Sequence, residues 1–338
     1  MSALLLLVAC LVLGVLVARF AHPPATLPQG LNWWVINVAL SALVLHLIPT
    51  LRFSWQFWFL SASQWVVFLG AWAVFASLGR ALHWSRARIG ALTLVCGLGN
   101  TAFIGFPMIE ALHGREGVKL AVVADQLGCF LALAIGGTIV AALYSGKSTS
   151  AKAVARRVLT FPPFVSLVVG IVAGALGGWP QPVDVIFDRL GATLVPLALF
   201  SVGLQFRLQF QSGQGAALLL ALGWKLAVAP LVILFAGLAI GVSDAILTIA
   251  VLESAMAPMI SAAILAEQND LERYVEPPLD SPRRLDVVCG DVVKTFEQPC
   301  QPRESYGIAY SWLPRDGTSN IRKIRGHVER GTADLPAD

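Results

Sequence analysis

The chain has 338 residues, of which 57% are hydrophobic and only 13% are charged, and its mean hydropathy is +0.73. A soluble domain is about half apolar and about one quarter charged, so this composition excludes a soluble globular protein and indicates an integral membrane protein. The formal net charge of +4 comes from charged loops and gives no indication of nucleic-acid binding.

Nine apolar segments follow one another along the chain, each close to the roughly 20 residues that a helix needs to cross a membrane. They cover residues 2–18, 30–49, 56–79, 89–112, 117–144, 160–178, 183–206, 215–240 and 245–266. Because each segment is continuously hydrophobic and lacks the alternation of a transmembrane strand, we predict membrane helices and not a barrel.

The chain becomes polar from Gln268 onward, where it carries ten Lys or Arg and twelve Asp or Glu residues. We expect residues 269–338 to be a cytoplasmic tail that is disordered or foreign to the membrane domain. The five cysteines lack the Cys-x-x-Cys spacing of a zinc or redox site, so no metal ion is expected.

Positive charge alternates from loop to loop. The loops after the first, third, fifth and seventh segments carry nine Lys or Arg residues, whereas the other four loops carry four. Positively charged loops stay on the cytoplasmic side. We therefore expect a multi-pass protein of the cell (plasma) membrane with its N-terminus outside and its tail in the cytoplasm.

Two segments carry a proline in mid-membrane among small and polar residues. Pro107 lies in the fourth segment and Pro258 in the ninth, 151 positions later. In the second and seventh segments, Ser41 and Pro196 are 155 positions apart. These similar offsets predict a five-helix unit used twice, over residues 1–145 and 146–268. An odd number of helices per unit turns the second copy upside down.

The prolines and nearby glycines predict interrupted helices. Proline removes a backbone N–H and clashes with the preceding turn, while glycine relaxes the helix. Gly99, Gly105 and Pro107 thus predict a break in the fourth segment, and Pro258 predicts one in the ninth. Paired breaks in inverted halves point to a transporter's substrate site, because unsatisfied backbone groups are not tolerated in lipid. The alternative is that the prolines only help the helices to pack.

Polar side chains near the breaks are candidate substrate ligands. Asn100 lies two helical turns before Pro107, and its amide can both donate and accept hydrogen bonds. Alternatively, Asn100 bonds a neighbouring helix. Ser254 and Ser261 flank Pro258, and their hydroxyls can bond a substrate or fold back on helix carbonyls.

Three ionisable residues, Asp125, Lys225 and Glu253, lie well inside predicted helices. Each would cost about 2.5–3.5 kcal/mol if it faced lipid, so we expect them to face the protein interior. Lys225 could attract an anionic substrate. Glu253 lies closer to a break than Asp125, so it ranks first of the two as the residue that couples transport to an ion. The alternative is a structural ion pair. His46 is interpreted as a packed residue.

Residues 97–128, GLGNTAFIGFPMIEALHGREGVKLAVVADQLG, resemble the fourth and fifth helices of the auxin efflux carrier family. The stretches PLALFSVGLQF (196–206), KLAVAPL (225–231) and ESAMAPMISAAILAEQ (253–268) resemble its seventh, eighth and ninth helices. The family includes plant auxin exporters and bacterial permeases for malate and malonate, and the resemblance covers residues 1–268.

The resemblance implies ten helices in two inverted five-helix repeats, with helices four and nine broken and crossing at the substrate site. It also implies transport of small organic anions, often linked to protons or sodium, and it points to Asn100, Pro107 and Pro258. Two features depart from the family. Ser41 stands where the family usually has a proline, which is expected to straighten the second helix. Residues 271–338 contain no segment that could form the tenth helix.

The sequence thus predicts an all-α membrane carrier, not an enzyme, that moves a small organic anion by alternating access. The anion and the lipid bilayer are the expected partners, and H⁺ or Na⁺ is the expected coupling ion, with no other cofactor. The surface uncovered by the missing helix could promote a homodimer. The alternatives are a coupled carrier of another family with the same fold, a truncated non-functional member, and an intramembrane enzyme. No catalytic constellation within the segments supports an enzyme.

Overall fold

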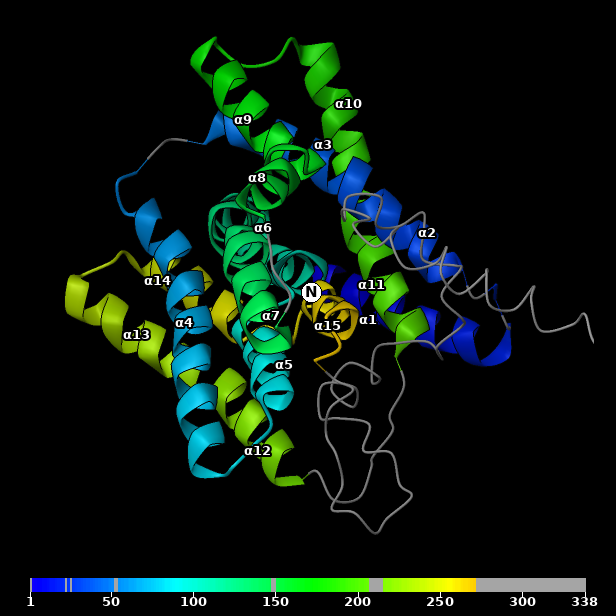
Figure 1. Cartoon of the computed structure of the whole chain (residues 1–338). Coiled ribbons are helices and arrows are strands. Elements are labelled where there is room, and N and C mark those ends of the chain that lie inside the picture. The colour runs from blue at the N-terminus through cyan, green and yellow to red at the C-terminus, as the bar shows by residue number, and fades with distance from the viewer. Residues whose placement is uncertain are drawn as a thin grey trace, which may run out of the picture.

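The computed structural model describes residues 2–21, 23–24, 26–51, 54–146, 150–206 and 215–271, and its elements are helices (Figure 1). The first half of the chain contains α1 (Ser2–Phe20), α2 (Leu27–Trp34), η1 (Val35–Leu40), α3 (Ser41–Leu47), η2 (Ile48–Thr50), α4 (Phe57–Ala81), α5 (Arg86–Gly97), η3 (Thr101–Gly105), α6 (Phe106–Val123), η4 (Ala124–Cys129), η5 (Ala132–Gly137) and α7 (Thr138–Ser145). The second half contains α8 (Ala151–Leu159), α9 (Pro162–Ala175), α10 (Gln181–Gly191), α11 (Leu194–Gln205), α12 (Gly215–Gly223), η6 (Trp224–Val228), α13 (Ala229–Ile240), α14 (Asp244–Ser254) and α15 (Ile260–Gln268).

Five helical runs in the described part of the chain are long and apolar enough to cross a membrane, or up to six if the bent pair α8–α9 counts as one span. These runs are Leu27–Thr50, Phe57–Ala81, Thr101–Ser145, Gln181–Gln205 and Leu219–Ile240. The number is below the predicted nine partly because α5, α14 and α15 belong to interrupted helices, and each piece is shorter than a full span.

The 45-residue run Thr101–Ser145 is not one straight helix. Gly114 within it has a φ of +65°, a left-handed conformation that glycine adopts without steric penalty. The chain turns there between the end of the fourth predicted segment and the start of the fifth. The prediction that two separate segments occupy this stretch therefore agrees with the backbone.

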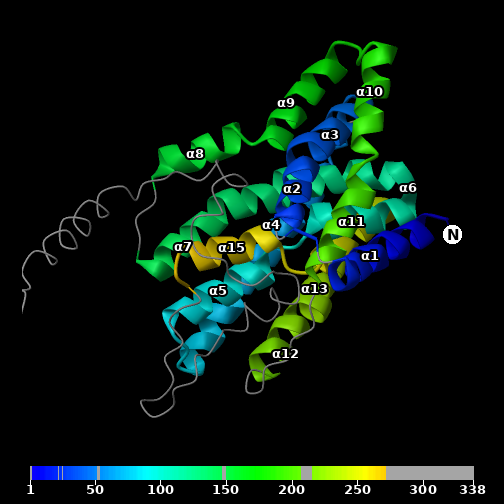
Figure 2. The same ribbon diagram turned by 90° about the vertical axis from the view of Figure 1, so that its right-hand side faces the viewer.

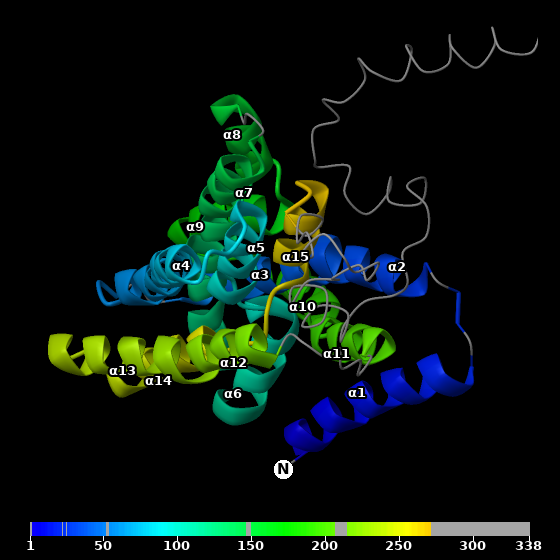
Figure 3. The same ribbon diagram turned by 60° about the horizontal axis from the view of Figure 1, so that its bottom comes forward.

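Contacts between helices divide them into two packing groups. The first packing group combines α1, α2, α3, α9, α10 and α11: α1 packs along α11, and α3 packs on both α9 and α10 (Figure 1). The second packing group combines α4–α7 with α12–α15: α4 packs on α5 and α14, and α13 runs beside α14 (Figure 3). Each group takes helices from both halves of the chain, so the two halves interlock.

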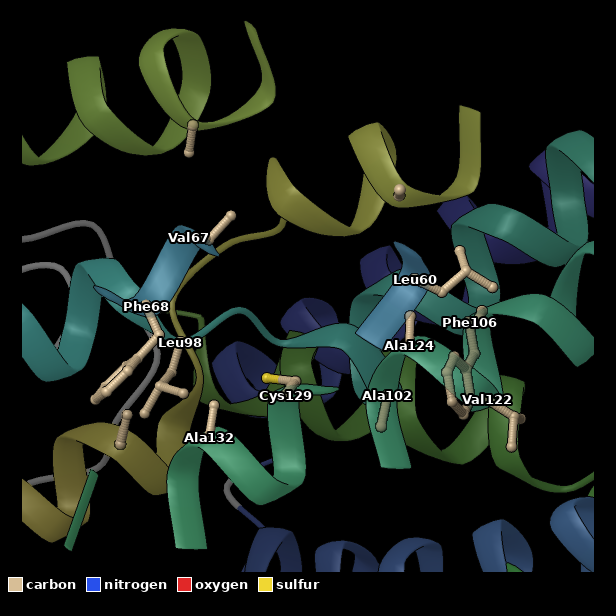
Figure 4. Packing of buried hydrophobic residues seen from close by; sticks show 14 of the residues in the cluster. Leu60, Val67, Phe68, Leu98, Ala102, Phe106, Val122, Ala124, Cys129 and Ala132 are labelled. Carbon is tan, nitrogen blue, oxygen red and sulfur yellow. The ribbon is translucent and has the colours of Figure 1, made fainter. Parts of the chain in front are cut away.

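A large part of the buried core belongs to the second packing group. Phe68 of α4 is 0% exposed, and its ring occupies space that side chains at Gly97 and Gly136 would need. A Cβ at Gly97 would lie 2.9 Å from the ring, and one at Gly136 would lie 2.5 Å from it. Figure 4 shows Phe68 and Leu98 among the packed side chains of this core. Close packing here holds the breaks of the interrupted helices in place.

Ser41 continues its helix without interruption, with φ −61° and ψ −43°. The run Leu27–Thr50 therefore passes through this position as one span, as expected where serine replaces a helix-breaking proline. The predicted polar tail and the predicted lack of a tenth helix concern residues 272–338, which lie outside the described residues.

Candidate substrate site

The two interrupted helices meet at their breaks. Residues 98–100 separate α5 from η3, and residues 255–259 separate α14 from α15. Gly99 of the first break and Pro258 of the second form an antiparallel bridge. Two segments that are far apart in the sequence thus cross inside the second packing group.

Each break supplies hydrogen-bond partners for the other. The Asn100 backbone N–H donates to the Ala257 carbonyl at 2.7 Å, and the Met259 N–H donates to the Leu98 carbonyl at 3.1 Å. The crossing therefore satisfies backbone groups that would otherwise be orphaned inside the membrane, which is the physical requirement for non-helical backbone at this depth.

The first break lies before the position that the sequence suggested. Pro107 is the second residue of α6 and lies within the continuous run Thr101–Ser145, directly after the π-helical turn η3, and π-helical adjustments of this kind accommodate a proline inside a membrane helix. The interpretation that Pro107 interrupts the fourth segment is therefore wrong. The Gly99 carbonyl, within the actual break, accepts a hydrogen bond from Cys129 Sγ at 3.2 Å, and Cys129 is labelled in Figure 4.

A cavity of about 180 Å³ lies between the two packing groups, beside the crossing. One wall comes from α2 and η1 of the first group, and another comes from η3, η4, η5 and α15 of the second; the helix α8 and the loop before α9 complete it. Apolar side chains form most of the lining. The polar residues that line it are Asn32, Asn37, Asn100, Asp125, Arg157, Ser261 and Gln268.

The structure places three of the predicted site residues in this cavity: Asn100, Asp125 and Ser261. Asn100 caps η3, because its Oδ1 accepts a hydrogen bond from the Phe103 N–H at 3.2 Å. Only 4% of Asn100 is exposed. Its side chain therefore faces a ligand space while its oxygen orients the first turn after the break.

Asp125 is almost completely buried, with 3% of its surface exposed. Its carboxylate accepts hydrogen bonds from the Thr101 hydroxyl and from Gln126 Nε2, the latter at 2.7 Å. Thr101 belongs to η3, so these bonds connect the carboxylate to the helix that starts at the first break. Asp125 is thus held in the cavity wall by donors on both sides.

Lys225 and Glu253 do not line the cavity but lie against the segment from Gly99 to Gly105. A Cβ at Gly99 would be 3.2 Å from Lys225 Nζ, and one at Gly105 would be 2.8 Å from Glu253 Oε2. Lys225 is 3% exposed and Glu253 is 0% exposed. Within the described ranges, neither charged end has a hydrogen-bond partner, and no ion pair joins them. Lys225 and Glu253 therefore do not form the structural ion pair that was the alternative interpretation.

The remaining predicted site residues have other positions. Ser254 is buried and its hydroxyl donates to the Val251 carbonyl at 2.7 Å, so it folds back on its own helix. Pro258 belongs to the crossing itself, and Gly105 provides the space for the Glu253 carboxylate. None of these three lines the cavity.

Four polar cavity residues are absent from the predicted site: Asn32, Asn37, Arg157 and Gln268, and Arg157 is the charged one. It was counted among the positive charges of a cytoplasmic loop, but it lies on the amphipathic helix α8 and faces the cavity. Its Nη1 donates to the Thr138 hydroxyl at 3.1 Å. The spacing of basic and apolar residues in residues 151–159 is typical of a helix with one polar face, and this pattern is the signal from which Arg157 could have been found.

His46 also differs from its interpretation as a packed residue. Its Nδ1 lies 2.8 Å from Asp184 Oδ1, and its Nε2 lies 3.7 Å from Asp188 Oδ1. Arg115 of α6 binds the same Asp188 carboxylate of α10. These four side chains form a charged cluster that joins the two packing groups.

The model of the membrane transport protein family matches residues 1–275 of the chain. The chain belongs to this family. It is the auxin efflux carrier family that the sequence motifs resemble, and its members are transporters rather than enzymes. The chain accordingly belongs to a family of membrane transporters, in agreement with the resemblance of its motifs.

Two relatives of the chain are named as uncharacterized transporters. The one from Methanothermobacter thermautotrophicus is 27% identical over 182 residues, which is 54% of this chain and 59% of the relative. The one from Methanocaldococcus jannaschii is 28% identical over 121 residues, which is 35% of this chain and 38% of the relative. The chain thus spans less than two thirds of the length of these relatives.

Proposed function

We propose that this transporter is a secondary carrier that moves a small organic anion across the plasma membrane by alternating access. The observation that carries the proposal is the cavity beside the crossing of two interrupted helices. Ligand sites at such crossings are typical of secondary transporters. Malate, malonate and auxin-like carboxylates are the substrate candidates.

Alternating access requires a site whose walls can move relative to each other, and the two packing groups supply such walls. Asn32 and Asn37 come from the first group, while Asn100 and Ser261 come from the second. A displacement of one group against the other would change the access to the cavity. The division into inverted repeats, residues 1–145 and 146–268, is part of this proposal, as is an N-terminus outside the cell.

We propose Asp125 as the first candidate for coupling to H⁺ or Na⁺, ahead of Glu253. Asp125 lines the same cavity as the substrate would, so an ion bound to its carboxylate would be released or retained together with the substrate. Glu253 lies beside the crossing without facing the cavity. It remains a second candidate, because an unpaired buried carboxylate is costly unless a proton or cation neutralises it.

Uptake into proteoliposomes tests the proposal. The purified protein is reconstituted and given radiolabelled malate, malonate or indole-3-acetate under imposed pH or sodium gradients. We expect uptake of at least one anion, and we expect Asn100→Ala to reduce its kcat/KM by about 3- to 10-fold, the value of one lost hydrogen bond.

Asn269→Ala is the matched control, because this asparagine bonds the Leu265 carbonyl and does not line the cavity. It should transport like the unmodified protein. Uptake no faster than in empty liposomes, for every anion and gradient, would contradict the proposed substrate class. Equal loss in both asparagine variants would contradict the site.

A further inference from the structure

An anion in the cavity needs a positive partner, and the described lining contains one. Of the cavity residues, only Arg157 is a lysine or arginine. Lys225, the cation that the sequence favoured, is buried against Gly99 and does not reach the lining. The charge that meets a substrate in this cavity therefore comes from α8 and not from the helix of Lys225.

We propose that Arg157 binds the carboxylate of the transported anion, which makes α8 part of the substrate site. This inference rests on the proposed carrier function and assigns a residue to it. The guanidinium is suited to the task, because its planar fork presents five N–H donors and matches a carboxylate in bidentate geometry.

The surroundings of Arg157 hold the guanidinium without neutralising it. The Thr138 hydroxyl accepts one of its N–H bonds and itself donates to the Ala134 carbonyl at 2.8 Å, so the hydroxyl is fixed in direction. None of the ion pairs found among the described residues includes Arg157. Asp125 shares the cavity without pairing with it. The positive charge is thus available to a ligand.

The position of α8 brings this charge to the cavity. The helix packs on η5 and on α9, at a bend of 59° to α9, and Figure 2 shows it lying across the bundle above α7. Arg156 on the same helix is exposed, whereas Arg157 is half-buried and turned inward. The two adjacent arginines therefore have different environments, so a substitution of Arg156 serves as a control for the same substitution of Arg157.

Aromatic side chains form part of the cavity lining to which Arg157 also belongs. Phe130 of the segment between η4 and η5 stacks on Phe161, the residue before α9, with ring centroids 4.1 Å apart and planes 15° apart. Both rings line the cavity. In an apolar setting of this kind a charge-assisted hydrogen bond is stronger than in water.

The test compares four variants in the proteoliposome assay: Arg157→Gln, Arg157→Lys, Arg156→Gln and Thr138→Val. The probe is whichever of malate, malonate and indole-3-acetate the unmodified protein takes up fastest. We expect Arg157→Gln to raise the KM for this anion by about 10- to 100-fold, the range for hydrogen bonds to a charged group. Arg157→Lys should raise it less, because the charge remains without the fork.

Arg156→Gln removes the same charge from the exposed face and should leave KM unchanged. Thr138→Val removes the anchoring bond and keeps the guanidinium, so it separates a structural role from binding. Equal increases in KM for Arg157→Gln and Thr138→Val, or for Arg157→Gln and Arg156→Gln, would overturn the inference. An unchanged KM in Arg157→Gln would also overturn the inference, but it would not contradict the proposed carrier function.

Thermal unfolding of the purified unmodified protein distinguishes failure of the function from failure of the residue assignment. We expect the transported anion to raise Tm, and we expect this increase to disappear in Arg157→Gln but not in Arg156→Gln. If the unmodified protein neither takes up nor is stabilised by any of the three anions, the proposed function is contradicted, and the assignment of Arg157 falls with it.

Discussion

Glu253 is tolerated inside the protein because its neighbour Gly105 has no side chain. The carboxylate oxygens lie 2.8 Å and 3.0 Å from the position of a Cβ on Gly105; the first distance is shorter than real Cβ contacts, and the second is tighter than most of them. Gly105 has an ordinary helical backbone, with φ −62° and ψ −55°. Position 105 therefore requires a glycine because the Glu253 carboxylate approaches it, and not because of its backbone conformation.

Gly105→Ala should lower the free energy of unfolding by about 1 kcal/mol, the lower end of the range for overpacking, because the end of the Glu253 side chain can turn aside. Thermal or SDS-induced unfolding of the purified protein measures the change. Gly223→Ala is the control, since nothing lies within 4 Å of a Cβ there. Equal stability of the two variants would show that Glu253 does not press on Gly105.

At the scale of the element, α1 and α11 approach through a pair of glycines. A Cβ on Gly14 would lie 2.3 Å from the Phe200 carbonyl oxygen, and one on Gly203 would lie 2.2 Å from the Leu11 carbonyl oxygen. Helices in membranes associate through small residues that let backbones come close, since lipid offers little hydrophobic driving force. This pair fixes the place of α1 in the first packing group.

Gly14→Ala should lower the free energy of unfolding by about 3 kcal/mol, the upper end of the usual range, because the obstructing atoms belong to the backbone and cannot turn away. The loss should exceed that of Gly105→Ala in the same unfolding assay. Gly30→Ala in α2 has nothing within 4 Å of the added Cβ and serves as the control. A loss at Gly14 no larger than at Gly30 would contradict the close contact of α1 with α11.

For the whole molecule, the division into two packing groups has a mechanical consequence. The cavity lies between the groups, and outside it the pair Arg115–Asp188 connects α6 of the second group to α10 of the first. The pair His46–Asp184, by contrast, connects α3 and α10 within the first group. If alternating access occurs by movement of one group against the other, the contact between Arg115 and Asp188 must change, whereas the contact between His46 and Asp184 need not.

Cross-linking tests this movement. In a variant whose native cysteines are replaced, Arg115→Cys with Asp188→Cys is treated with a bifunctional methanethiosulfonate. We expect uptake to be lost and then restored by a reductant. Cross-linked His46→Cys with Asp184→Cys should transport normally. Full uptake after quantitative cross-linking of the first pair would show that the two groups do not move against each other there.

The sequence alone determined what depends on local composition and spacing. Long apolar segments predict membrane helices because lipid cannot bond a free backbone, and the stretch around Gly99 and Asn100 carried the resemblance to the carrier family. Asn100, Asp125 and Ser261 could be found in this way, because polar residues inside apolar segments are conspicuous. The chain indeed belongs to that family, and the elements of the described residues are helices.

Only the tertiary structure decided which of these residues share a cavity. Pro107 lies within a continuous helical run and Pro258 lies in a break, although both prolines stand in mid-segment among small and polar residues, because the effect of a proline depends on which backbone groups its neighbours can bond. Arg157 and not Lys225 lines the cavity, because the packing of α8 on η5 turns Arg157 inward while Lys225 is enclosed beside Gly99. The spacing of residues along a helix predicts which of them share a face, but that face makes its contacts with helices that are distant in the sequence.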